Sequence, residues 1–235
     1  MKRFVIGDIH GRYEALREVL QKSKFNYKKD KLIVLGDIVD GGDKVYDVVE
    51  ELLKIKNLIF VRGNHDEWFI KFMNEGFDKE IWLQQGGKNT IRSYGGEVLN
   101  TYISKNIMNT TNLNIPITHQ NFFNQSVLYY IEDKMLFVHG GINPKIPKIT
   151  SQSKIDLLWD RNLINYCSKG KKVPNYDKIF VGHTATHTII NNIFTPINFG
   201  QLWCMDTGAG WDGLLTIMNI DTLETFKSKF QKVCR

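Results

Sequence analysis

The chain has 235 residues, of which 42% are hydrophobic and 24% charged, and a formal net charge of +6. Its apolar and charged content is that of an ordinary soluble globular protein, and its length is most simply that of one domain, residues 1–235. The three cysteines are widely spaced and form no CxxC pair, which excludes a disulfide framework and a cysteine zinc site and favours a reducing cytoplasm.

Neither the N-terminus nor any apolar run indicates export or membrane insertion. Only three apolar residues follow Arg3 before Gly7 and Asp8, too few for a signal peptide. No apolar run reaches the roughly 20 residues that cross a bilayer, so we expect a cytoplasmic protein without a membrane partner. The positive net charge suits an enzyme with an anionic substrate but does not identify that substrate, because the Lys and Arg residues are scattered.

Strands and helices alternate in the first third of the chain. Short apolar runs predict buried strands near residues 3–7, at 32–35 and at 58–61. Apolar residues at helical spacing predict a helix near 12–24, a second helix after residue 42 and a third around Trp68 to Met73. The second helix is expected to bury one face made of Val45, Val48, Val49, Leu52 and Leu53.

This alternation predicts an α/β fold with neighbouring parallel strands and right-handed crossovers, in which ligands lie beyond the carboxyl ends of the strands. Residues 78–130 differ, because paired glycines and a stretch rich in Asn and Thr interrupt them. They predict a helical, loop-rich excursion over one side of the sheet, bordering the ligand site and without a strand. Further strands are predicted at 135–138, 179–181, 202–205 and within 214–220.

Five of the apolar runs end in turns that carry glycine and metal-capable side chains. These side chains are Asp8 and His10, Asp37 and Asp40, Asn64 to Asp66, His139, and His183. Glycine lets the backbone approach a metal or a phosphate closely, and imidazole with carboxylate suits Mn, Fe or Zn better than calcium. Each polar residue alone could stabilise its own turn, but together they favour metal binding. We therefore expect the five turns to meet at one dinuclear metal centre.

The ordered motifs GD-x-H-G, GD-x-x-D-x-G, RGNHD, HGG and GHT resemble those of the calcineurin-like metallophosphoesterase superfamily. The chain is most similar to the phosphoprotein phosphatase branch, including small bacterial and phage serine/threonine phosphatases, and to the symmetrical dinucleoside-tetraphosphate hydrolases. The likeness runs from residue 4 to about residue 218, where LLWDR and DTGA also match. It implies the metallo-dependent phosphatase fold, a four-layer α/β/β/α sandwich with mixed sheets and a helical, loop-rich excursion near 78–130.

The resemblance also implies two divalent metal ions, with Mn²⁺ favoured and Fe, Zn or Ni as alternatives. Asp8 and His10 are expected to bind the first metal and Asp37 to bridge both. The second metal is expected to be completed by Asn64, His139 and His183.

In the mechanism that the resemblance implies, a water bridging the metals becomes the hydroxide nucleophile. His65 then protonates the leaving oxygen, and Asp40 orients that imidazole. Arg62 and Arg161 are expected to hold the phosphoryl oxygens. Arg161 rests on a looser match and could instead be a surface ion-pair residue.

The second motif departs from the family pattern GD-x-x-D-R-G, because Gly41 stands where the arginine is expected. Glycine cannot replace that charge, so the hypothesis is that catalysis persists with altered substrate preference. Asp66, where the protein phosphatases usually have Glu, is interpreted as a minor difference.

Three functions remain open from the sequence. The favoured one is a phosphomonoesterase of the serine/threonine protein phosphatase type, acting on a phosphorylated protein or a small phosphoester. The alternative is a dinucleoside-polyphosphate hydrolase or phosphodiesterase acting on nucleotides, and the least favoured is a metal-containing binding module without turnover. Asp206 is interpreted as a structural residue or a support for the metal ligands. The remaining histidines are interpreted as ordinary surface or packed residues and three tryptophans as core or rim aromatics: His119, His187, Trp82, Trp159 and Trp211.

Overall fold

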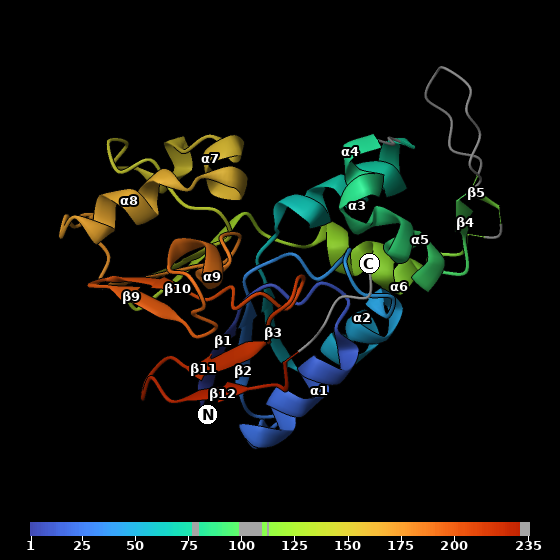
Figure 1. Ribbon diagram of the computed structural model, residues 1–235, viewed down its shortest axis with the longest axis horizontal. Helices are drawn as coiled ribbons and strands as arrows, with labels where there is room; N and C mark the ends of the chain where they lie inside the picture. The colour runs from blue at the N-terminus through green and yellow to red at the C-terminus, as the bar shows by residue number, and fades with distance from the viewer. Residues whose placement is uncertain (77–79, 99–109, 112, 231–235) are drawn as a thin grey trace.

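The computed structural model describes residues 1–76, 80–98, 110–111 and 113–230, and most of its strands form two five-stranded sheets (Figure 1). The first sheet has the order β12-β11-β1-β2-β3, with β1, β2 and β3 parallel and β11 antiparallel to β1. Its strands are β1 (Arg3–Ile6), β2 (Lys31–Val34), β3 (Asn57–Phe60), β11 (Thr216–Asn219) and β12 (Thr225–Lys227).

The second sheet has the order β6-β7-β8-β10-β9, with β7, β8 and β10 parallel and an antiparallel strand at each edge. Its strands are β6 (Tyr129–Glu132), β7 (Met135–Val138), β8 (Lys178–Val181), β9 (Ile197–Phe199) and β10 (Leu202–Cys204). Both sheets are therefore mixed.

Helices cover the outer face of each sheet. On the first sheet these are α1 (Tyr13–Lys22), α2 (Val45–Leu53), α3 (Asn64–Glu75), α4 (Glu80–Trp82), the π-helical turn η1 (Leu83–Gly87), α5 (Lys88–Ser93) and α6 (Ile117–Asn124). On the second they are α7 (Lys154–Trp159), α8 (Asn162–Ser168) and α9 (Thr186–Ile189), with a short 3₁₀ turn η2 (Ile149–Ser151) before α7. Figure 1 shows the first group on one side of the strands and the second group on the other.

The alternation of side chains along the strands fixes these layers. In β1, Phe4 and Ile6 pack against the helices of the first sheet, whereas Val5 packs between the two sheets. In the same way Phe137 of β7 and Phe180 of β8 turn toward the first sheet and stack with ring centroids 5.0 Å apart. Three apolar layers thus separate helices, sheet, sheet and helices, which confirms the predicted α/β/β/α sandwich.

The excursion near 78–130 is only partly as predicted. Its helices α4 to α6 pack on the first sheet, but it also holds a two-stranded ladder of β4 (Glu97–Val98) with β5 (Thr110–Thr111), where no strand was expected. The edge strand β6 also begins at Tyr129, before the predicted end of the excursion at residue 130. Such short or edge strands lack the long apolar alternation on which the prediction depends. Residues 99–109 and 112 of the excursion lie outside the described residues.

One residue predicted to lie on the buried face of the second helix does not lie on that face. Val45, Val48, Val49 and Leu52 of α2 are fully buried, whereas Leu53 is 43% exposed. At 3.6 residues per turn, Leu53 lies about 90° around the helix from the centre of the buried face. The end of the apolar series was therefore wrong by one residue. No helix among the described residues is long and apolar enough to cross a membrane.

The neighbouring residues Leu52 and Leu53 provide a matched test of the buried face. Leu52→Ala removes a fully buried side chain and is expected to lower the free energy of unfolding by about 2–5 kcal/mol. Leu53→Ala is expected to change it by less than about 1 kcal/mol. Urea unfolding of both variants checks this, and equal losses would contradict the placement of α2.

Candidate metal centre

Two groups of three side chains meet beyond the carboxyl ends of parallel strands from both sheets, and the groups share Asp37. The first group is Asp8, His10 and Asp37, and the second is Asp37, His139 and His183. Within each group, one possible ligand atom per residue lies within 4.8 Å of the others. Asp37 follows β2 and so stands between the turn after β1 and the turns after β7 and β8.

The turns that carry these residues adopt an unusual backbone and are tied to one another. His10, Asp37, Asp40 and His183 have positive φ angles of 48°, 47°, 67° and 63°. Non-glycine residues adopt this conformation at a cost of about 1–2 kcal/mol each. The amides of Ile9 and His10 both donate to the Asp37 carbonyl, at 3.0 and 2.8 Å, and the His183 amide donates to the Asp8 carboxylate. The turns thus hold each other in strained conformations, as is typical of functional sites.

Backbone carbonyls orient two of the imidazoles. The Nδ1 atom of His10 lies 2.9 Å from the Val39 carbonyl oxygen, and that of His139 lies 2.6 Å from the Leu35 carbonyl oxygen. A carbonyl can only accept, so each Nδ1 carries a proton and Nε2 is the ring atom that remains to face a ligand. This arrangement is typical of histidines that ligate a metal.

Nitrogen and oxygen atoms that can bind a metal converge around the second group. The Nε2 atom of His139 faces Oδ1 of Asn64 at 2.9 Å and Oδ2 of Asp37 at 3.3 Å. The buried Nε2 atom of His183 has no hydrogen-bond partner among the described residues. A buried imidazole nitrogen without a partner, close to a carboxylate, is stabilised by a cation. The residues present therefore fit a metal, and Asn64 is placed to complete the second group.

Buried charge supports the same interpretation. Burial raises the pKa of Asp8, and the nearby carboxylates of Asp206 and Asp37 raise it further. Burial also raises the pKa of Asp206, to about 6. For Asp37, burial would raise the pKa, but the imidazoles of His139, His65 and His10 lower it well below its ordinary value. Burial, followed by the neighbouring imidazole of His139, lowers the pKa of His183 to about 3, so this ring is a neutral acceptor. The buried carboxylates and the neutral ring of His183 together provide a pre-formed cation site.

The Asp66 side chain links the turn after β2, which carries Asp37, to the turn after β3. Its carboxylate accepts hydrogen bonds from the amides of Asp37 at 2.7 Å, Ile38 at 3.1 Å and Gly63 at 2.8 Å. The side chain is completely buried, and burial and the charge of Asp37 raise its pKa to about 7. The sequence interpretation of Asp66 as a minor difference missed this role, which depends on contacts across 29 residues.

His65 and Asp40 form a buried pair beside the first group. The Nδ1 atom of His65 donates to Oδ2 of Asp40 at 2.6 Å. The same carboxylate accepts from the Trp82 indole at 3.0 Å and from the Thr90 hydroxyl at 2.7 Å. Burial lowers the pKa of His65, but the carboxylates of Asp37 and Asp40 outweigh it and raise the pKa to about 9. The His65 ring lies edge-on to the His10 ring, with centroids 5.1 Å apart, so the pair adjoins the metal ligands.

The two arginines that are predicted to bind phosphate have different surroundings. Arg62 is partly committed, because it donates to Glu67 at 2.9 Å and to the hydroxyl and carbonyl of Ser126 at 2.9 and 3.2 Å. Two of its five N–H groups remain. Arg161 is exposed and lines a cavity together with His183.

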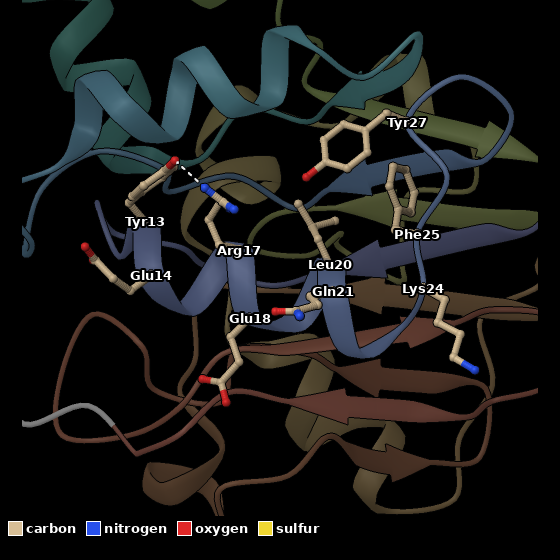
Figure 2. A pocket seen from close by; sticks show the side chains of 9 residues that line it. All are labelled: Tyr13, Glu14, Arg17, Glu18, Leu20, Gln21, Lys24, Phe25 and Tyr27. Carbon is tan, nitrogen blue, oxygen red and sulfur yellow. Dashed lines mark hydrogen bonds between the residues drawn. The ribbon is translucent and has the colours of Figure 1, made fainter.

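Two cavities flank the metal centre. One, of about 530 Å³, is lined by His10, Gly41, His65 and residues of the excursion. The other, of about 560 Å³, is lined by Arg161, His183 and residues around α9. Trp211 lines both. A third cavity, of about 610 Å³ along α1, contains none of the predicted site residues (Figure 2).

The excursion borders the site, as the sequence predicted, but its contacts could not be anticipated. Trp82 and Thr90 reach Asp40 from 42 and 50 residues away, and no local pattern marks either one. The expectation that Trp82 is a core or rim aromatic describes only its packing. His119 is buried between Tyr94 and Glu50, in keeping with an ordinary packed histidine.

Comparisons with known proteins agree with this geometry. Residues 1–211 match the family described as calcineurin-like phosphoesterase. The chain belongs to this family. It is 31% identical over 171 residues to a symmetrical bis(5'-nucleosyl)-tetraphosphatase of Buchnera aphidicola subsp. Acyrthosiphon pisum (strain Tuc7), which covers 72% of this chain and 50% of that relative. The match thus spans half the length of that relative.

Two further comparisons concern the branch of the family and the fold. Serine/threonine-protein phosphatase 1 of Salmonella typhimurium is 24% identical, with 92% of this chain and 91% of that protein covered. A solved metallophosphoesterase from Sphaerobacter thermophilus has a TM-score of 0.59 at 18% identity, covering 98% and 90%, and supports the fold. The predicted phosphoprotein phosphatase-like branch is confirmed, since the relatives of this family include both symmetrical bis(5'-nucleosyl)-tetraphosphatases and serine/threonine phosphatases.

Removing the Asp66 carboxylate tests its role in the centre. Asp66→Ala leaves three buried amides without their acceptor and is expected to lower the free energy of unfolding by about 3 kcal/mol or more. Asp43→Ala, at an exposed carboxylate of the adjoining loop, is the matched control and is expected to change it by less than about 0.5 kcal/mol. Chemical denaturation without added metal measures both. An Asp66→Ala variant as stable as its control would contradict the linking role.

Proposed function

We propose that this chain hydrolyses dinucleoside polyphosphates at a dinuclear metal centre. The observation that carries the substrate class is the pair of cavities that flank the centre and share Trp211. A substrate with two nucleoside arms joined by a phosphate chain can place one arm in each cavity while the chain crosses the centre. The name of the Buchnera relative, a symmetrical bis(5'-nucleosyl)-tetraphosphatase, supports this substrate class.

The second candidate is the serine/threonine phosphatase activity that the sequence favoured. The similarity to serine/threonine-protein phosphatase 1 supports it. A phosphorylated peptide requires only one arm beside the phosphoryl group, so this activity leaves one of the two cavities without a role. We therefore place it after the nucleotide-directed activity.

In this proposal, six residues hold the metals: Asp8, His10, Asp37, Asn64, His139 and His183. Manganese is the favoured ion, with Fe, Zn or Ni as alternatives, because these residues offer only nitrogen and oxygen ligands. When bound, the two ions would polarise the phosphoryl group and supply an acidified water. Both sheets contribute ligands, so we infer that residues 1–235 act as one domain.

The remaining chemistry belongs to side chains around the centre. Asp40 fixes the proton on Nδ1 of His65, which leaves Nε2 to deliver a proton to the departing oxygen as the bond to phosphorus breaks. Trp82 and Thr90 hold the Asp40 carboxylate in place and exclude water from it. Arg62, through its two remaining N–H groups, and Arg161 bind phosphoryl oxygens.

Replacing the general acid is expected to separate catalysis from metal binding. His65→Ala should lower kcat by about 10²–10⁴-fold while the metal content stays that of the unaltered protein. Metal analysis and steady-state kinetics with Mn²⁺ measure the two quantities side by side. A variant that loses its metals together with its activity would show that His65 is a ligand instead.

A substrate panel tests the proposed class. With Mn²⁺ present, kcat/KM is compared for a symmetrical dinucleoside tetraphosphate, a phosphopeptide, an aryl phosphate and a bis-aryl phosphodiester. The dinucleoside tetraphosphate is expected to have the highest value. A higher value for the phosphopeptide would favour the second candidate, and binding without turnover of any of the four would favour a non-catalytic module.

A further inference from the structure

Position 41, directly after Asp40, carries no cation because it is a glycine. Gly41 has a φ of +74°, a left-handed conformation that side chains rarely adopt. A Cβ at this position would lie 3.2 Å from Cβ of His10 and 3.4 Å from the carbonyl oxygen of Gly210. The backbone at position 41 therefore suits glycine. Glycine cannot supply the positive charge of the arginine that the family motif has at this position.

The excursion packs directly against the loop that holds Gly41. The side-chain amide of Asn89 donates to the Gly41 carbonyl at 2.6 Å, and the Thr90 hydroxyl accepts from the Asp40 amide at 2.9 Å. Gly86 lies so close that a Cβ there would be 2.3 Å from the Gly41 nitrogen. These contacts fix the start of α5 relative to the metal-binding turns.

This placement brings two cations to the cavity beside the centre. Lys88 and Arg92 are four residues apart on α5 and so share one face of the helix, and both line the 530 Å³ cavity with His10, Gly41 and His65. The side chain of Asn89, fixed by its bond to Gly41, accepts from Nη1 of Arg92 at 3.4 Å.

The cavity contains no opposing charge. Its lining includes no carboxylate, and among the residues that the structure describes neither Lys88 nor Arg92 forms a salt bridge. Two unpaired cations on one wall create a positive potential that attracts an anion. The guanidinium offers paired donors that match a phosphate.

We propose that Lys88 and Arg92 form a subsite for a second phosphate group, next to the phosphate that is cleaved. This inference rests on the proposed function and narrows its substrates to phosphoanhydrides, in which a further anionic phosphate adjoins the reacting one. An isolated phosphomonoester does not engage the subsite.

Kinetics on two substrates test the subsite. Lys88→Gln, Arg92→Gln and the double variant are compared with the unaltered protein on a dinucleoside tetraphosphate and on an aryl phosphate. Each single variant is expected to lower kcat/KM for the tetraphosphate about tenfold or more, because a hydrogen bond to a charged group is lost. The value for the aryl phosphate is expected to change less than about threefold. Equal losses on both substrates, or no loss on either, would overturn the subsite.

A charge-matched control excludes a general effect of net charge. Arg17→Gln removes one positive charge from α1, where the Arg17 side chain is 60% exposed and lines the cavity of Figure 2. It is expected to leave both kcat/KM values unchanged. A fall for the tetraphosphate as large as that of Arg92→Gln would assign the effect to overall charge and overturn the subsite.

Binding of a non-hydrolysable probe separates the subsite from the proposed function. Methylenediphosphonate carries two phosphonate groups and methylphosphonate carries one. Calorimetric titration of the Mn²⁺-loaded protein is expected to show that the double variant loses affinity for the first about tenfold or more and keeps its affinity for the second. If the unaltered protein hydrolyses no phosphoester, the proposed function fails, but this titration still decides the subsite. Unchanged affinity of the double variant for methylenediphosphonate would overturn it.

Discussion

The burial of several carboxylates in one small volume is the constraint on which this structure depends. Asp8, Asp37, Asp66 and Asp206 are each at most 4% exposed, and all four lie near the metal centre. Buried anions cost several kcal/mol each unless they are paired or bonded. Asp66 is satisfied by three backbone amides, whereas the Asp8 and Asp37 carboxylates belong to the two groups of possible metal ligands. Metal cations are the partners that this arrangement lacks.

The two-sheet architecture brings these charges together. Parallel strands of the first sheet deliver Asp8 and Asp37, and parallel strands of the second deliver His139 and His183. The layer between the sheets, with the stacked rings of Phe137 and Phe180, sets the distance between the two sets of turns. A defect in this layer would therefore affect the geometry of the centre as well as stability.

Local sequence predicted the parts that depend on local pattern. Apolar runs ended at the metal-capable turns, so the residues of both groups could be named as candidates before their contacts were known, and the family resemblance divided them between two metals. The role of Asp66, by contrast, depends on a carboxylate reaching amides 28 and 29 residues away, and the contacts of Thr90 with Asp40 span 50 residues. Such contacts are created by tertiary packing and leave no periodicity in the sequence. The exposed Leu53 and the short strands β4 and β5 were missed because apolar pattern alone is weakest at the ends of elements and in two-residue strands.

The bridging position of Asp37 is the central claim, and the metal content of an Asp37 variant tests it most directly. After saturation with Mn²⁺ and removal of free metal, the unaltered protein should retain two ions per chain, and Asp37→Ala should retain fewer than one, because both groups share this carboxylate. Asp43→Ala, at an exposed carboxylate in the adjoining loop, should retain two. An Asp37→Ala protein that is folded and still holds two ions would contradict the account.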